Sequence, residues 1–404
     1  MRNARVLTAE AGVRLADRLD EVLPAAACEL ALAAAETATV VVDEAGEGAA
    51  AAVVALRAEG LYADLAAARL VACGSRAAFV RAANRSGVDA AARPLLSEIA
   101  RAVAAERTRP AAVRLRDRTL DFATGAKVMG ILNVTPDSFY DRGAYSGVDR
   151  ARARAAEMVA HGAAVIDVGG QSYAHWNPRV AEEEERARVV PVVEALVRDR
   201  LDAAISIDTF KSGVAEAALA AGAHLINDCS GLSDPKLAAT VARYDAGLVM
   251  MHLKGELNVR APEGYRYDDA LGEILAFLRE RTDRALADGV AADALLIDPG
   301  LEFGKEPATD LEILERFGDL RSLGYPILFA ASRKSFIGRV FGRPAKELLV
   351  PSLATAALGI AAGAGLVRVH DVEETAQLAT MLGAVRRERR RTLEVAARMP
   401  GTPA

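Results

Sequence analysis

The chain is predicted to be an α/β protein whose larger part is a (β/α)₈ TIM barrel with an N-terminal hairpin cap, preceded by a small α/β domain. Three observations predict this fold class. Eight short apolar runs alternate with helical segments over about 280 residues, which is the size and rhythm of a closed parallel barrel. An open doubly wound sheet rarely contains eight strands, and no G-x-G-x-x-G motif follows the first run. Alanine, a strong helix former, is abundant throughout.

The small domain is expected over residues 1–110 and the barrel over residues 111–404. In the first region, strand candidates at Thr39–Val42 and Arg69–Cys73 lie among alanine-rich helical stretches. This alternation favours a small α/β domain. Nothing in its residues indicates what the domain does.

The barrel begins with a predicted hairpin. Residues 112–134 read as two strands joined by a turn around Thr124–Gly125, and this hairpin is expected to cover the bottom of the barrel. The eight barrel strands are predicted at Val128–Asn133, Ala164–Val168, Ala204–Asp208, His224–Asn227, Gly247–His252, Leu295–Asp298, Ile327–Ala330 and Leu366–Val369. Helices are predicted in the gaps, for example at Val148–Met158, Glu182–Val197, Gly213–Ala220 and Asp268–Ala287.

The composition is typical of a packed globular protein, with 52% apolar and 26% charged residues among 404. The net charge of -5 gives no electrostatic footprint for nucleic acid or a membrane surface, and no apolar run is long enough to span a membrane. The three scattered cysteines, Cys28, Cys73 and Cys229, indicate reduced thiols. Because no signal peptide is evident either, a cytoplasmic location is expected.

Polar residues stand at the ends of all eight predicted strands. A single polar strand end is as often a helix cap as a functional group, but eight favour one site, because the strand ends of such a barrel converge at one mouth. The carboxylates and amides there suit paired N–H donors, and the cations suit an anion. The predicted ligand is a nitrogen-rich heterocycle that carries phosphate. The strand-end residues are Asn133, Gly169, Gly170, Asp208, Asn227, His252, Asp298, Ser332, Lys334, Arg368 and His370.

Seven segments in this region resemble, in order and spacing, the signature motifs of dihydropteroate synthases. They are MGILNVTPDSF (Met129–Phe139), SIDTFK (Ser206–Lys211), INDCSG (Ile226–Gly231), MMH (Met250–His252), DPGLEFGK (Asp298–Lys305), SRKSFIG (Ser332–Gly338) and RVHDV (Arg368–Val372). Each motif alone is weak evidence. Seven in register over residues 112–390 are highly specific.

The resemblance implies roles for individual residues. The implied pterin-binding residues are Asp208, Asn227, Met250, Asp298, Phe303 and Lys334. The implied catalytic residues are Asn133, Asp137, Arg368 and His370, of which Asn133, Arg368 and His370 would hold pyrophosphate. The family's Asn at position 133 is also associated with Mg²⁺, the one cofactor expected here. Asp137 would lie on the loop that helps close the site.

The family reaction implied is the condensation of 7,8-dihydropterin-6-ylmethyl pyrophosphate with 4-aminobenzoate, which gives dihydropteroate and pyrophosphate in folate biosynthesis. The task of the enzyme is electrostatic, because the leaving group must be neutralised while positive charge develops on the methylene carbon. Small-molecule substrates are therefore expected as partners, with neither nucleic acid nor membrane. Family resemblance also suggests a homodimer formed through the later barrel helices.

The chain departs from the family pattern around the amine substrate. After the second strand it reads GGQSYAHW where GGESTRPG is usual, so Tyr173 replaces a Thr near the aminobenzoate ring and Ala174 replaces an Arg associated with pyrophosphate. Arg142, His175 and Arg179 are candidates to replace that cation.

Two further positions belong to the same region. Glu302 stands where the family favours Gly, which places a bulkier acid near the second substrate, and Ser332 is expected to line the same side.

Three alternatives to an ordinary synthase remain, two from these departures and one from the shared fold. The protein could join the same pterin electrophile to a different amine, or bind pterin with little or no synthase activity. It could also be a methyltetrahydrofolate-dependent corrinoid methyltransferase, whose barrel is similar. The SRKSFIG and RVHDV segments favour the branch that uses pyrophosphate.

Overall fold

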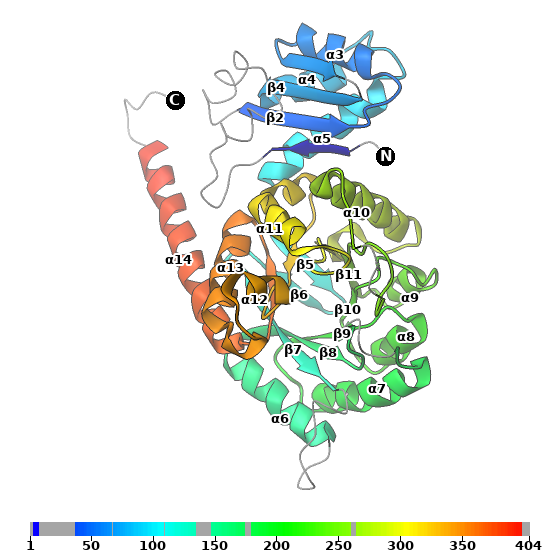
Figure 1. Ribbon diagram of the computed structural model, residues 1–404, viewed down its shortest axis with the longest axis vertical. Helices are drawn as coiled ribbons and strands as arrows, with labels where there is room; N and C mark the ends of the chain where they lie inside the picture. The colour runs from blue at the N-terminus through cyan, green and yellow to red at the C-terminus, as the bar shows by residue number, and fades with distance from the viewer. Residues whose placement is uncertain are drawn as a thin grey trace. The chain divides into compact units, whose positions relative to one another are not determined.

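The computed structural model of the protein describes residues 3–7, 37–66, 68–108, 110–134, 147–173, 179–259 and 264–397. The described residues fall into two compact units. The first unit draws on Met1–Pro110, Tyr267–Glu280 and Ala308–Tyr325, and the second on Ala111–Arg266, Arg281–Pro307 and Pro326–Ala404. Figure 1 shows the small sheet of the first unit and the barrel of the second.

The first unit is built on a four-stranded antiparallel sheet in the order β1-β2-β4-β3. The strands are β1 (Asn3–Val6), β2 (Thr37–Asp43), β3 (Tyr62–Ala66) and β4 (Arg69–Ser75). The predicted strands at Thr39–Val42 and Arg69–Cys73 lie within β2 and β4. Helices α3 (Ala49–Ala58), α4 (Arg76–Asn84) and α5 (Arg93–Arg107) contribute Leu56, Phe79 and Ile99 respectively, all fully buried, to one apolar core with the sheet.

The same unit includes residues from much later in the chain. Helix α5 packs against β1 and against the 3₁₀ helix η3 (Phe317–Leu323). Arg5, whose side chain is only 4% exposed, pairs with Asp43 and also with Asp269 at 2.7 Å. Because this unit draws on both sides of position 110, the division into domains 1–110 and 111–404 stays a prediction.

The second unit contains an eight-stranded parallel sheet in the order β12-β11-β10-β9-β8-β7-β14-β13. Its edge strands are joined by a parallel bridge between Ile297 and Ile327, so the sheet closes into a barrel. The strands are β7 (Lys127–Asn133), β8 (Ala163–Gly169), β9 (Ala204–Asp208), β10 (Leu225–Asp228), β11 (Gly247–Met251), β12 (Leu295–Asp298), β13 (Leu328–Phe329) and β14 (Leu366–Val369). The predicted fold class is confirmed.

Helices follow the barrel strands, and Figure 1 shows α6, α7 and α8 along the outside of β7, β8 and β9. The helices after residue 110 are α6 (Gly147–Ala160), α7 (Glu182–Arg198), α8 (Ser212–Ala220), α9 (Leu237–Arg243), α10 (Ala270–Ala287), α11 (Pro307–Glu315), α12 (Ser335–Phe341), α13 (Leu349–Ala362) and α14 (Val372–Ala397). Two short 3₁₀ helices, η2 (Ala292–Ala294) and η4 (Ala345–Glu347), complete the connections. None of the helices described is long and apolar enough to cross a membrane.

The hairpin that precedes the barrel turns at a different place from the one predicted. Strands β5 (Ala112–Leu115) and β6 (Arg118–Asp121) pair so that Leu115 faces Arg118, which leaves Arg116–Asp117 as a two-residue turn. Arg116 has a φ of 58°, the left-handed value that tight hairpin turns require. A turn does lie at Thr124–Gly125, where Gly125 N donates to Phe122 O at 3.1 Å. It links β6 to β7, however, so its predicted place as the turn of the hairpin is wrong.

The apolar bottom of the barrel explains this register. Val113, Leu115 and Leu120 of the hairpin join one cluster with an interior apolar residue from each of the eight barrel strands. A hairpin with another register would expose these side chains, since successive residues of a strand point to opposite faces. The hairpin therefore covers the bottom of the barrel, as predicted, and the opposite end is left for polar groups.

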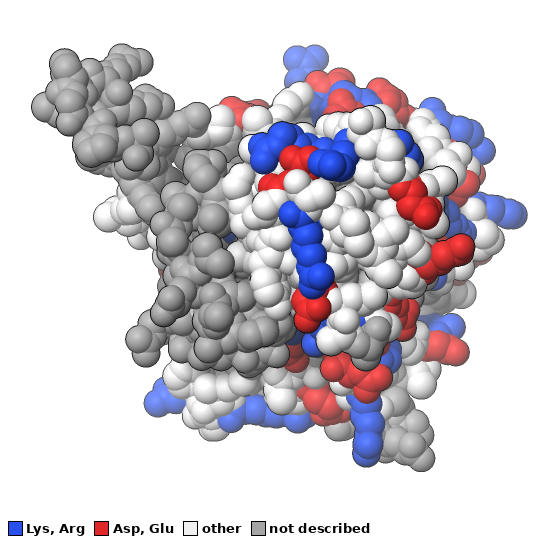
Figure 2. Space-filling view, turned by 90° about the horizontal axis from the view of Figure 1, so that it is seen from above, with Lys and Arg blue, Asp and Glu red and all other residues white. Residues whose placement is uncertain are grey.

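Charges of both signs are mixed on one face of the molecule. On the face drawn in Figure 2, acidic and basic side chains lie next to one another, and neither sign forms a continuous area among the coloured residues. The charge distribution on this face would not steer a charged polymer strongly.

Candidate active site

The carboxyl ends of neighbouring strands bring several polar residues together. Asp208, the last residue of β9, is in register with Asn227 of β10 and with Gly169 of β8. A side chain at Gly169 would meet Asn133 Oδ1 at 3.3 Å and Asp208 Oδ2 at 3.7 Å. The ends of β7 to β10 therefore converge at one mouth, where parallel barrels carry their active sites.

Arg368 of β14 connects these groups across the barrel. Its Nε donates a hydrogen bond to Asp167 Oδ2 at 2.6 Å, and its Nη2 donates to Asp208 Oδ2 at 2.7 Å. Asn227 Nδ2 donates to the same oxygen of Asp167 at 3.1 Å. Charge-assisted bonds of this kind are stronger than neutral ones. Four side chains from four strands thus form one network inside the barrel.

Sequence reasoning misses Asp167, because it lies inside the apolar run of β8 rather than at its end. The signal is the carboxylate itself, since a charge within a buried strand is costly unless it is paired. Asp167 is fully buried, and its Oδ1 has no hydrogen-bond partner in the part of the chain that the structure describes. It supports Arg368 and Asn227 from beneath the mouth.

The site raises the pKa values of two carboxyl groups. Burial raises the pKa of Asp208 to about 7, with Arg368 acting in the opposite direction and Asp167 adding to the rise. Burial also raises the pKa of Asp298, against the opposing charges of Lys334 and Arg368. Asp298 ends β12 in register with Met251 at the end of β11, so it lies at the same end of the barrel as Asp208. Perturbed carboxylates in a cleft are typical of functional sites.

Two glycines shape the loop after β12. Gly300 and Gly304 have φ values of 68° and 66°, and a Cβ at either would lie about 2 Å from the carbonyl oxygen of His252 or Lys254. Glu302, between them, has a φ of 69° without being a glycine. Its Oε1 accepts a hydrogen bond from Phe336 N at 3.0 Å. Glu302 therefore joins the loop after β12 to the first turn of α12.

Lys305 anchors the same loop from below. Its ammonium donates to the carbonyl oxygens of Gly300 at 2.7 Å and Phe303 at 2.9 Å, and lies 3.0 Å from His252 Nδ1. Burial and the charge of Lys305 lower the pKa of His252 well below its usual range. His252, predicted as a polar strand end, is therefore a neutral imidazole that contacts the Lys305 ammonium beneath the loop.

Lys334 lies over the same loop. Its Nζ donates to Leu301 O at 2.5 Å and stands 5.0 Å from the centre of the Phe303 ring, a cation–π distance. Phe303 packs on the apolar cluster that contains Cys229 and Met251. Lys334 and Phe303, both predicted for the pterin site, are therefore neighbours.

The methionine predicted for the pocket wall is the wrong one. Val249 belongs to the apolar cluster inside the barrel, and Met251 belongs to the cluster at the mouth. Successive strand residues point to opposite faces, so Met250, between Val249 and Met251, points to the outer face of the barrel. There it is fully buried. Met251 takes the place that Met250 was expected to fill.

The structure describes only some of the residues predicted around the pyrophosphate. Ser332 Oγ lies 3.0 Å from His370 Nδ1 and accepts a hydrogen bond from His370 N at 3.2 Å, so the ends of β13 and β14 are tied together. Asn133 ends β7 with an exposed side chain. Asp137 lies outside the described residues.

Tyr173 occupies the mouth where a smaller residue is usual. Its hydroxyl donates to Asp208 O at 3.2 Å, and its ring centre is 6.1 Å from that of Phe210. Burial raises the pKa of Tyr173 well above its usual value, and the neighbouring Cys229 and Asp208 add to the rise. The tyrosine therefore remains a neutral wall beside Asp208.

Loop contacts hold the start of the altered segment. Lys211 Nζ donates to Gln171 Oε1 at 2.8 Å and pairs with Glu185, which is fully buried. Arg179 donates to Glu256 at 3.2 Å and to Leu257 O at 3.1 Å, and its side chain is half exposed. Ala174, Arg142 and His175 lie outside the described residues.

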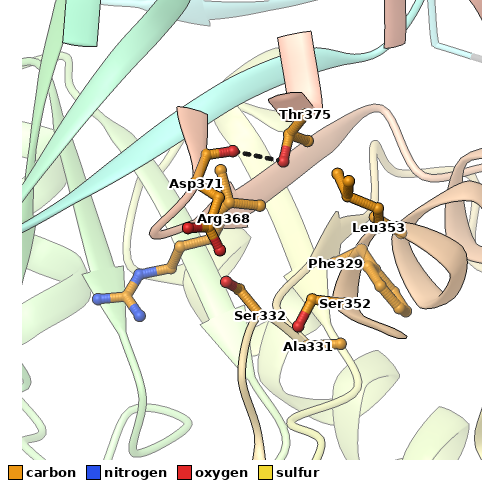
Figure 3. Close-up of a pocket in the computed structure, with 10 residues that line it drawn as sticks. Phe329, Ala331, Ser332, Ser352, Leu353, Arg368, Asp371 and Thr375 are labelled. Carbon is orange, nitrogen blue, oxygen red and sulfur yellow. Dashed lines mark hydrogen bonds between the residues drawn. The ribbon is translucent and has the colours of Figure 1, made fainter. Parts of the chain in front are cut away.

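A small cavity of about 10 Å³ lies near β14 but is not the mouth. Figure 3 shows Phe329, Leu353 and Ser352 on one side of it, while the guanidinium of Arg368 points away from it. The cavity has room for about one water molecule. The interior of the barrel, where Arg368 points, carries the chemistry.

This fold and this arrangement define a barrel enzyme that holds a nitrogen-rich heterocycle next to an anionic group. Residues 129–370 match the family model described as pterin binding enzyme. The dihydropteroate synthase of Bacillus subtilis (strain 168) is 41% identical over 279 residues, which are 69% of this chain and 92% of the relative. The chain therefore belongs to the family of pterin binding enzymes, among its dihydropteroate synthases.

Solved structures are similar to the same part of the chain. The Xanthomonas albilineans dihydropteroate synthase with 4-aminobenzoic acid is 38% identical, with a TM-score of 0.64, and the match covers 69% of this chain and 99% of that one. The structure of the same enzyme in complex with 7,8-dihydropteroate is 38% identical, with a TM-score of 0.62 over 68% of this chain and 98% of that one.

Proposed function

We propose that the protein is a transferase that condenses 7,8-dihydropterin-6-ylmethyl pyrophosphate with 4-aminobenzoate to give dihydropteroate and pyrophosphate. The observation that carries this proposal is that Asp208, Asn227 and Arg368 form one network at the mouth, with Asp298 at the neighbouring strand end and Lys334 bonded to the loop that follows it. Buried carboxylates accept paired N–H groups of a flat heterocycle, and the two cations suit the substrate's anionic end.

The chemistry required of these residues is positional and electrostatic. The amine nitrogen forms a bond to the methylene carbon as the carbon–oxygen bond to pyrophosphate breaks, and the nitrogen then loses a proton to solvent. Asp208, Asn227 and Asp298 would orient the pterin. Arg368 and His370 would face the leaving pyrophosphate, whose developing charge a fixed guanidinium stabilises.

Magnesium is proposed as the cofactor, with Asn133 as its protein ligand. Mg²⁺ is usually bound by one or two protein oxygens together with substrate phosphates and water, and the Asn133 amide oxygen beside Gly169 is such a donor. Among the described residues, no group of three His, Cys, Asp or Glu side chains forms a self-contained metal site. When bound, the ion would neutralise the pyrophosphate.

A homodimer in the cytoplasm is also proposed. The exposed apolar residues Val350 and Met381, 72% and 65% exposed, lie on the later helices α13 and α14 and support self-association there. Cys73 and Cys229 are free thiols, which suits a reducing compartment. Sedimentation of wild type and of Met381→Glu tests the dimer, and a monomeric wild type contradicts it.

A second candidate function is the transfer of the same pterin to a different amine. Tyr173, whose hydroxyl donates to Asp208 O in the mouth, is larger than the residue usual in the family and supports this candidate. The alternative of a corrinoid methyltransferase is set aside, because the relatives reported above are dihydropteroate synthases.

The test measures pyrophosphate release with and without 4-aminobenzoate, together with calorimetry of pterin binding to wild type and Asp208→Ala. Release that depends on 4-aminobenzoate supports the synthase. Pterin binding without such release favours the second candidate. Equal pterin binding by both proteins excludes this site.

A further inference from the structure

We infer that Glu302 is a positioning residue of the pterin site, whose carboxylate fastens the loop after β12 to the first turn of α12, directly after Lys334, and thereby holds Lys334 in place. The inference rests on the proposed function, in which Lys334 contacts the pterin. Glu302 would act through Lys334 and would not touch the substrate.

The backbone gives the first observation. Glu302 has a φ of 69°, a left-handed conformation that is unfavourable for a non-glycine residue. Arg333, in the facing loop, has a φ of 57°. Such strain persists where surrounding contacts require it, and it gathers at functional sites. Two strained residues in adjacent loops, one of them next to Lys334, indicate that the geometry between the loops is maintained.

The contacts between the loops are reciprocal. Glu302 Oε1 accepts from Phe336 N at 3.0 Å, while Lys334 Nζ donates to Leu301 O at 2.5 Å. The ammonium also lies over the ring of Phe303 at 5.0 Å. The residues on both sides of Glu302 thus contact Lys334. Fixing Glu302 therefore fixes the carbonyl and the ring that locate the ammonium.

The facing loop is secured at its other end. Arg333 makes two hydrogen bonds to Asp371, at 2.8 Å and 2.6 Å, and its backbone N donates to Ser352 Oγ at 2.9 Å. Three consecutive loops, after β12, β13 and β14, are therefore joined by side chains. Within that chain of contacts, Glu302 is the link on which the position of Lys334 relative to Phe303 depends.

The position of Lys334 has an electrostatic consequence. Burial raises the pKa of Asp298, and Lys334 is the main charge that opposes this rise, ahead of Lys305 and Arg368. If the ammonium moved away, the pKa of Asp298 would increase and less carboxylate would be available at a given pH. Losing Glu302 should therefore change the pH dependence of pterin binding, which a general loss of stability would not do.

The experiment compares Glu302→Gly with Glu302→Gln. Glycine relieves the φ strain but removes the link, whereas glutamine keeps an Oε1 acceptor for Phe336 N. Calorimetry with 6-hydroxymethylpterin should show binding about tenfold weaker for the glycine variant and within about twofold of wild type for the glutamine variant. The midpoint of binding against pH should move upward for the glycine variant alone.

The matched control is Arg200→Gly. Arg200 is another left-handed residue, with a φ of 53°, just after α7 and therefore at the opposite end of the barrel. This variant should bind the pterin as wild type does. Thermal unfolding confirms that each variant is folded.

Two results would overturn the inference while leaving the proposed function intact. One is wild-type affinity in Glu302→Gly, and the other is equal weakening in the glycine and glutamine variants, which would make the charge and not the link responsible. If wild type itself does not bind 6-hydroxymethylpterin, the proposed function fails and the inference fails with it.

Discussion

Arg368 Nη2 donates a hydrogen bond to Asp208 Oδ2 at 2.7 Å, and this pair joins β14 to β9 across the inside of the barrel. The arginine side chain is 18% exposed and the aspartate side chain 11%. In the proposed function the two residues serve opposite ends of one substrate. In the structure they also form an ion pair with each other, and Arg368 makes a second ion pair with Asp167.

Removing the guanidinium should destabilise the protein. Arg368→Gln leaves two buried carboxylates without their cation, and breaking a buried pair from one side costs about 3–5 kcal/mol. Chemical denaturation of the variant measures this loss. Adding Asp208→Asn should recover part of it, because the excess negative charge is reduced. An Arg368→Gln protein as stable as wild type would contradict the paired network.

Pterin binding should strengthen as the pH rises through 7. Burial raises the pKa of Asp208 to about 7, and the carboxylate must be ionised to accept two N–H groups. Protonation therefore competes with binding below this pKa, and affinity should be about tenfold lower at pH 6 than at pH 8. Calorimetry at several pH values measures it. An Asp208→Asn variant should show a weaker dependence, with the part due to Asp298 remaining, and the same slope in both proteins would assign it elsewhere.

Replacing Tyr173 should open the amine side of the mouth. Tyr173→Thr removes a ring that packs near Phe210 and a hydroxyl that donates to Asp208 O. We expect kcat/KM for 4-aminobenzoate to rise, most clearly when Ala174→Arg is added, and the free energy of unfolding to fall by about 2–3 kcal/mol because a cavity is left. Tyr173→Phe is the control, since it keeps the ring. Unchanged kinetics in the threonine variant would show that Tyr173 only packs on the rim.

Gly169 should be needed for binding of the pterin pyrophosphate and not for folding of the protein. A methyl group there would lie 3.3 Å from Asn133 Oδ1 and 3.7 Å from Asp208 Oδ2. Gly169→Ala is therefore expected to weaken binding of the pterin pyrophosphate with little change in stability. Gly359→Ala is the contrasting variant, because its methyl would lie 2.8 Å from the Phe329 ring. It should destabilise the protein by about 1–3 kcal/mol through overpacking and leave affinity unchanged.

The sequence alone determined the barrel and its polar rim. Apolar runs at regular spacing predict parallel strands, and the polar residue that closes each run predicts a shared mouth, because all strands of a parallel barrel end at the same side. Asp208, Asn227 and Asp298 could be chosen in this way. Motif resemblance then supplied the kind of ligand.

Only the tertiary structure decided how these groups pair. Asp167 stands inside a strand, so no strand-end rule selects it, and its partner Arg368 is 201 residues away. Met251 replaces Met250 because the face that a strand residue points to depends on the register of its neighbours. The hairpin turn at Arg116–Asp117 follows from the burial of Leu115 and Leu120 in a core contributed by eight other strands. Spacing along the chain predicts which elements form. Which side chains pair, and which face of a strand points inward, depends on contacts between distant residues, and these contacts exist only once the barrel has closed.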